Sequence, residues 1–189
     1  MRNPASALAL AVLLALPAPL AAQGYGQRFG AIIAGATSSD ISDYYNSTDS
    51  RWGFTGGVMV GMNHGRTATS LEALYVQKGA QDIELDYIEI PFTFGAAVPI
   101  SEGAGRFRFY GGIAVAFKVS CGASDIVCDD ANGTEFSLPF GVQFARVSGN
   151  KFFGVDIRYG LPLSDVFDTI EAVNRPWYFR VFVGKALGS

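Results

Sequence analysis

Apolar residues alternate with small or polar residues in segment after segment of this chain. The segment at residues 135–145 shows the pattern best, because large apolar side chains occupy every second position: Phe136, Leu138, Phe140, Val142 and Phe144. A β-strand sends successive side chains to opposite faces, so the pattern predicts one apolar face and one polar face. Segments of about ten residues can cross a bilayer as tilted strands, whereas strands of soluble proteins usually contain about five or six residues.

Eight such segments are separated by residues that favour turns. The first is the weakly patterned segment at 28–37, and the last begins at Trp177. The connections after the second, fourth and sixth segments are short, whereas those after the first, fifth and seventh contain about ten residues or more, as in outer-membrane barrels. The connection after the third segment is intermediate in length. We therefore predict an all-β fold, an eight-stranded antiparallel up-and-down transmembrane β-barrel with a side-chain-filled interior.

A soluble barrel with an internal pocket is the competing fold, because it also has eight alternating strands. Its polar face would have to meet water. The polar face of these segments is rich in glycine and poor in lysine, which favours the membrane barrel.

The first residues are typical of a signal peptide. Arg2 supplies a positive charge, an apolar stretch follows at 7–16, and Ala21 and Ala22 form a small-residue cleavage site. The apolar stretch is too short for a membrane-spanning helix. We expect a cleaved signal peptide at 1–22, followed by one outer-membrane β-barrel domain at 23–189.

Charge separates the two ends of the predicted barrel. The chain has 14 basic and 17 acidic residues, a balance that gives no sign of nucleic-acid binding. Most acidic residues fall in the long connections, whereas Arg66, Arg106, Arg146 and Lys151 flank the short turns. The acidic connections could hold divalent cations that bridge to lipopolysaccharide phosphates, or they could form an ordinary solvated surface. No ordered ligand spacing favours the first alternative, so we expect neither a metal site nor a cofactor.

Two cysteines, Cys121 and Cys128, lie in a stretch rich in Gly, Asp and Asn that is predicted to be a loop. In an exported protein we expect them to form a disulfide with each other. A metal site is the alternative, but no histidine lies nearby to complete it.

Ten charged side chains are expected to point into the barrel because of their position in the alternation. Both signs are present, so these groups can pair, whereas unpaired buried charges would be strongly destabilising. We predict an interior ion network, with a gated ion path or a polar ligand site as the alternative. Its expected members are Arg51, Glu72, Lys78, Glu89, Arg108, Lys118, Glu135, Asp156, Arg158 and Arg180.

Two neighbouring motifs, EALYVQKG at 72–79 and YIEIPF at 87–92, resemble the paired motifs of PorT-like small outer-membrane β-barrel proteins. These proteins belong to the wider OmpA-like barrel group. The resemblance implies an eight-stranded barrel in a Gram-negative outer membrane. Some members of the family assist protein secretion and gliding.

The expected function is that of a non-enzymatic, monomeric outer-membrane barrel with a structural, envelope-stabilising or loop-mediated interaction role. Its connections at 37–50, 121–134 and 164–174 would contact lipopolysaccharide or an envelope protein. A secretion-accessory barrel, a small pore and a membrane-embedded lipid hydrolase remain alternatives. The hydrolase is disfavoured because the only histidine, His64, falls in a predicted turn at 63–66, at the end of the barrel opposite the long connections.

Overall fold

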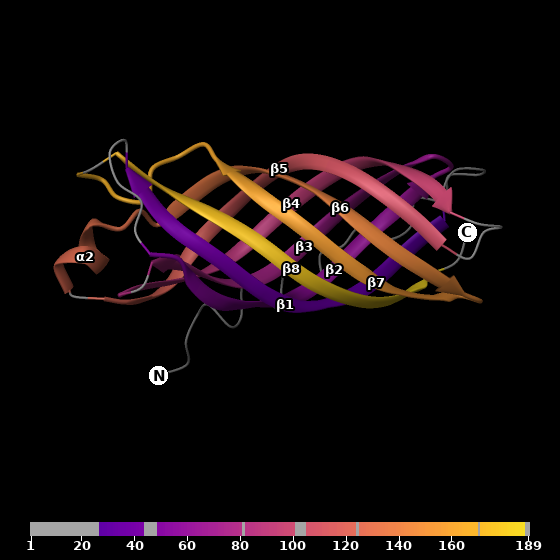
Figure 1. Cartoon of the computed structure of the whole chain (residues 1–189), viewed down its shortest axis with the longest axis horizontal. Helices are drawn as coiled ribbons and strands as arrows, with labels where there is room; N and C mark the ends of the chain where they lie inside the picture. The colour runs from indigo at the N-terminus through magenta and orange to yellow at the C-terminus, as the bar shows by residue number, and fades with distance from the viewer. Residues whose placement is uncertain are drawn as a thin grey trace.

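Eight antiparallel β-strands form a closed barrel in the computed structural model (Figure 1). The structure describes residues 27–43, 49–80, 82–100, 105–123, 125–169 and 171–187. Each strand pairs with its neighbour in sequence, and β1 pairs with β8 to close the sheet. The elements are β1 (Gln27–Asp43), β2 (Arg51–His64), β3 (Thr67–Ala80), β4 (Ile83–Ile100), β5 (Gly105–Gly122), α2 (Asp125–Asp130), β6 (Thr134–Ser148), β7 (Lys151–Pro162) and β8 (Ala172–Ala186).

Alternation sorts the side chains of each strand between the lumen and the outer surface. On β6, Phe136, Phe140 and Phe144 are exposed on the outside, whereas Glu135 is buried inside. Apolar side chains cover the outer surface of the other strands in the same way, as expected for a barrel in contact with lipid. Closure leaves no unpaired strand edge, which a lipid environment requires. The predicted eight-stranded barrel is therefore confirmed.

The two ends of the barrel differ in the length of their connections. At one end, tight turns at 65–66 and 149–150 use Gly65 and Gly149, whose φ angles of 68° and 60° favour glycine. The start of β1 and the end of β8 lie at this end, which we call the short-turn end. The opposite, long-loop end carries the connections after the odd-numbered strands, namely 44–50, 81–82, 123–133 and 163–171. α2 belongs to the connection at 123–133 and marks the long-loop end, at the left of Figure 1.

Two strands extend further toward the long-loop end than the sequence predicts. β1 continues to Asp43, within the loop expected at 37–50, and β8 begins inside the loop expected at 164–174. The two extensions pair with each other, and Asp40 lies opposite Arg175 on their outer face. The outward positions of the two extensions carry charged residues because they lie beyond the apolar outer surface of the barrel. The alternation of apolar and polar residues therefore ends before the strands do.

The expected loop at 121–134 is also wrong in part, because its middle forms the short helix α2. The helix runs from Asp125 to Asp130, and Val127 packs against the buried residues of the long-loop end. Two other connections are tighter than expected. β2 runs to His64, so the turn into β3 covers only 65–66, and only 81–82 separate β3 from β4.

The predicted signal peptide at 1–22 lies outside the described residues. In the described part of the chain, no helix is long and apolar enough to span a membrane.

Candidate functional site

The centre of the lumen holds two arginines and two carboxylates in direct contact. Arg158 donates to Glu72 at 2.6 Å, and Arg180 donates to Glu72 at 2.8 Å and to Asp156 at 2.6 Å. Tyr110 donates to Asp156 at 2.7 Å and accepts from Nε of Arg158 at 3.0 Å. All five side chains are buried, so their charges are satisfied by each other rather than by water. We call this group the central network.

A second group of buried charges lies next to it, toward the long-loop end. The ammonium of Lys78 lies 2.8 Å from Glu89 and 3.4 Å from Glu135. The Tyr178 hydroxyl donates to Glu89 at 2.8 Å, and the Tyr87 hydroxyl donates to Glu135 at 2.5 Å. One lysine is therefore shared by two carboxylates, each of which also accepts a tyrosine hydrogen bond. This group is called the lysine network below.

The two networks contain seven of the ten residues expected inside the barrel. Arg51 lies outside them because it begins β2 at the rim, where it pairs with Glu84. Lys118 also differs from the prediction, since it donates to the main-chain carbonyls of Cys128 and Ala131. Both residues lie at the long-loop end, where Arg51 binds a carboxylate of the rim and Lys118 binds loop carbonyls in place of the lumen carboxylates.

Arg108 is buried in the lumen, yet it contacts no carboxylate among the described residues. Its guanidinium donates to the hydroxyls of Ser70 at 3.3 Å and Thr93 at 3.0 Å, and to the carbonyl of Ala68 at 3.2 Å. The expected membership of Arg108 in the ion network is therefore wrong. Its acceptors are neutral because it lies closer to the short-turn end than the four lumen carboxylates do.

The tyrosines of both networks were not among the expected site residues. Tyr87, Tyr110 and Tyr178 occupy inward positions of their strands, and each hydroxyl donates to a buried carboxylate. The alternation alone could have placed them in the lumen. The choice of acceptor depends on contacts between distant strands, which the pattern of one segment does not contain.

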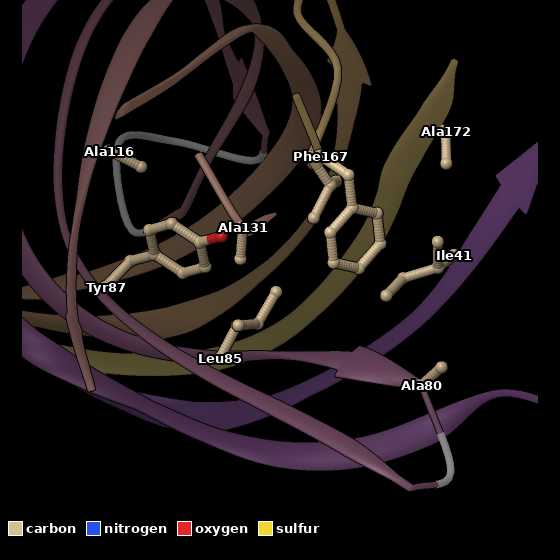
Figure 2. Close-up of a cluster of buried hydrophobic side chains, with 9 residues drawn as sticks. Ile41, Ala80, Leu85, Tyr87, Ala116, Ala131, Phe167 and Ala172 are labelled. Atoms are coloured by element: carbon tan, nitrogen blue, oxygen red, sulfur yellow. The ribbon is translucent and has the colours of Figure 1, made fainter. Parts of the chain in front are cut away.

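An apolar cluster closes the lumen at the long-loop end. Figure 2 shows Phe167 reaching from the β7–β8 connection toward Ile41 of β1 and Leu85 of β4, with Tyr87 close by. Phe167 is only 6% exposed, although it belongs to a connection rather than a strand. The connection therefore folds into the mouth of the barrel and covers the ion networks beneath it.

Hydrogen bonds join the β5–β6 and β7–β8 connections above this cluster. The amide of Asn132 donates to the carbonyl of Val166 at 2.7 Å, and the Thr169 hydroxyl donates to the Asp130 carboxylate at 2.6 Å. These contacts link parts of the chain that are more than thirty residues apart, so the two connections form one surface. The described residues of 123–133 and 163–171 are called the loop platform below.

A disulfide joins Cys121 at the end of β5 to Cys128 in α2, as predicted. A register shift between β4 and β5 at Asp86 and Tyr87 places Cys121 beside Leu85, next to the apolar cluster. The disulfide therefore fastens α2 to the barrel wall.

The arrangement offers no obvious catalytic centre in the described part of the chain. His64 is exposed at the end of β2, and its carbonyl accepts a hydrogen bond from Thr67 at 3.3 Å. Among the described residues, no three His, Cys, Asp or Glu side chains are grouped so that they could hold a metal ion. What the geometry provides is a lumen that is filled at its middle and at its long-loop end, beneath two connections joined by hydrogen bonds.

Comparison with known proteins points in the same direction as this geometry. Residues 8–174 match the family model described as Outer membrane protein beta-barrel domain. The fold is similar to that of Neisserial surface protein A, with a TM-score of 0.58 and 13% identity over 87% of this chain and 100% of that one. It is also similar to Outer Membrane Protein W of E. coli, with a TM-score of 0.51 and 11% identity over 88% of this chain and 100% of that one. None of the curated proteins compared with the chain matches it.

Proposed function

Because this chain belongs to the outer membrane protein β-barrel domain family and lies in the outer membrane, we propose that it is a non-enzymatic barrel whose loop platform binds a partner at the cell surface. In this family the long loops face outward, so the platform would be extracellular. The barrel itself would serve as a rigid, monomeric support.

The observation that carries this proposal is the filled lumen. The central network and the lysine network occupy the middle of the barrel, and the apolar cluster covers its long-loop end. A continuous water path would have to separate several buried ion pairs, and this would be strongly destabilising. The proposal therefore assigns the specific role to the outer surface, and it expects no ion conductance in planar-bilayer recordings.

The charge of the loop platform indicates the chemistry of its partner. Its two connections contain six acidic residues and no lysine or arginine: Asp125, Asp129, Asp130, Asp165, Asp168 and Glu171. A partner with a basic surface fits this charge directly. Lipopolysaccharide phosphates would be repelled unless divalent cations lie between them and the carboxylates.

The test is cross-linking in intact envelopes followed by purification of the barrel. Asp129 and Asp165 are exposed on the platform, and Asp49 and Asp82 are exposed elsewhere at the same end. We expect the double variant Asp129→Asn with Asp165→Asn to lose a cross-linked partner. The matched control, Asp49→Asn with Asp82→Asn, removes the same charge and should keep it.

Equal cross-linking by both double variants would contradict the proposal. Contact with lipopolysaccharide that disappears when EDTA is added would identify the divalent-cation mode of binding. Contact that survives EDTA, together with a captured basic protein, would identify direct binding.

A secretion-accessory role is the second candidate, favoured by the resemblance to PorT-like barrels. The charged residues of the two motifs, Glu72, Lys78 and Glu89, all belong to the interior networks. The charged residues of the motifs therefore serve ion pairing in the lumen rather than contact with a secretion partner. Recovery of an export complex in the cross-linking experiment would support this second role.

A further inference from the structure

The short-turn end of the lumen contains a cavity that neither the ion networks nor the proposed function of the loop platform explains. Its volume is about 100 Å³, and its apolar walls include Phe29, Met59, Phe152 and Phe182. It lies at the opposite end of the barrel from the loop platform, next to the turn at Gly149. Apolar walls of this kind favour a ligand that has a hydrocarbon part.

Arg108 lines this cavity, and no described residue forms an ion pair with it. It is 6% exposed, and its hydrogen bonds go to two hydroxyls and one carbonyl. Its Nε has no hydrogen-bond partner among the described residues. Arg158 and Arg180, by contrast, each bind a carboxylate in the central network. A buried guanidinium with a free donor, facing a cavity, is therefore a site where an anion would be stabilised.

The other charged residues around the cavity have the same sign. Arg106 and Lys151 line it with Arg108, and no described lining residue is an aspartate or glutamate. The acidic residue nearest in sequence, Glu102, lies in the β4–β5 connection, outside the described residues. The described charges around the cavity therefore favour a negative ligand.

We propose that this cavity binds the carboxylate of an apolar organic acid, with Arg108 as the residue that holds the carboxylate. The apolar walls would contact the first carbons of the chain. A cavity of about 100 Å³ is smaller than the ~150 Å³ cavity that accepts benzene, so it would hold only the carboxylate end of a longer ligand. A free fatty acid and the C-terminus of an apolar peptide both present this chemistry.

Methionine NMR of the folded full chain in lipid nanodiscs tests the proposal, with hexanoate as the probe. Met59 lines the cavity and is 2% exposed, so its ¹³C-methyl signal reports binding there. Met62 shares the outward parity of Val58, so its signal reports partitioning into the lipid. We expect hexanoate to shift Met59 saturably and hexanol, the neutral analogue, to bind about tenfold or more weakly.

Three variants, one of them a control, locate the site. Arg108→Gln should weaken hexanoate binding by about tenfold or more, because the charged donor is lost. Arg146→Gln, an exposed residue at the same end, is the control and should leave binding unchanged. If Arg108→Gln does not fold, Ala97→Leu fills the cavity without removing its charge and should abolish binding.

Three results would overturn the proposal: equal binding of hexanol, equal binding of inorganic phosphate, or shifts of Met62 that follow those of Met59. If hexanoate binds as expected, two further ligands distinguish the source of the carboxylate. A short apolar peptide with a free C-terminus that binds more tightly than hexanoate, and loses binding when amidated, indicates a polypeptide end. Tighter binding of decanoate than of the peptide indicates a fatty acid.

Discussion

Ion pairs of the same chemistry lie in two contrasting places in this barrel. Arg180 and Glu72, at the centre of the lumen, have side chains that are 1% and 2% exposed. Arg51 and Glu84, at the long-loop rim, have side chains that are 25% and 35% exposed. In the lumen, loss of one partner leaves a charge that water cannot reach. At the rim, water can replace the partner, so burial rather than pairing decides how much each bond contributes to stability.

The largest effect is expected when Glu72 is removed. Glu72→Ala leaves both Arg158 and Arg180 without one of their carboxylate acceptors, and only Arg180 keeps an ion pair, with Asp156. We expect the free energy of unfolding to fall by about 3–5 kcal/mol. Urea titration of the barrel in lipid vesicles, followed by tryptophan fluorescence, measures this change.

The control for this variant is Glu171→Ala, which removes the same charge from an exposed position. It should change stability by less than about 0.5 kcal/mol. Similar losses for the two variants would mean that the central network does not stabilise the barrel.

A somewhat smaller loss is expected for Glu89→Ala in the lysine network. In this variant the ammonium of Lys78 still has Glu135 as a carboxylate partner, at 3.4 Å. The Tyr178 hydroxyl, however, loses its acceptor. We expect a destabilisation of about 2–3 kcal/mol, visible as unfolding at a lower temperature in gel assays of heat-modifiability. Glu89→Gln, which retains an acceptor for Tyr178, should fall between this variant and the parent protein. A heat-modifiability pattern identical to that of the parent would refute the prediction.

The sequence predicts which residues enter the lumen because strand geometry fixes the parity of each side chain. Glu72, Asp156 and Arg180 are placed correctly for this reason. Parity does not predict which residues pair with each other. The partners of Glu72 are Arg158 and Arg180, which belong to strands far away in sequence. Arg108 has the correct parity, but its acceptors among the described residues are hydroxyls and a carbonyl, and a strand pattern does not reveal that difference.

The long-loop end is predicted less well because its connections have no repeating pattern of apolar and polar residues. The contact between Asn132 and Val166 depends on how two connections meet, and neither connection has a regular pattern. The register shift at Asp86 and Tyr87 also changes which way the end of β5 faces. Such a shift adds one residue to a strand and reverses the parity beyond it, so the surroundings of Cys121 follow from the structure alone.

The rim also contains a covalent bond, so it allows a comparison between an exposed ion pair and a disulfide. Replacing Cys121 and Cys128 by serine removes the bond that fastens α2 to the end of β5. Chain-entropy arguments give a loss of about 2 kcal/mol for so short a loop, and we expect it to fall on the loop platform. Limited proteolysis should then cut within 123–133 while the heat-modifiability of the barrel is retained. Resistance equal to that of the oxidised parent would show that the hydrogen bonds of the platform suffice to hold it.

The smallest effect is expected at the rim ion pair itself. Glu84 binds Arg51 and also accepts a hydrogen bond from Gln77 at 3.2 Å, but its ion pair with Arg51 is open to water. Glu84→Gln keeps an oxygen acceptor and removes the charge, so the free energy of unfolding should change by about 0.5 kcal/mol or less. The urea titration used for Glu72→Ala measures it under the same conditions. A loss comparable to that of Glu72→Ala would show that pairing, rather than burial, sets the contribution of an arginine–carboxylate bond in this barrel.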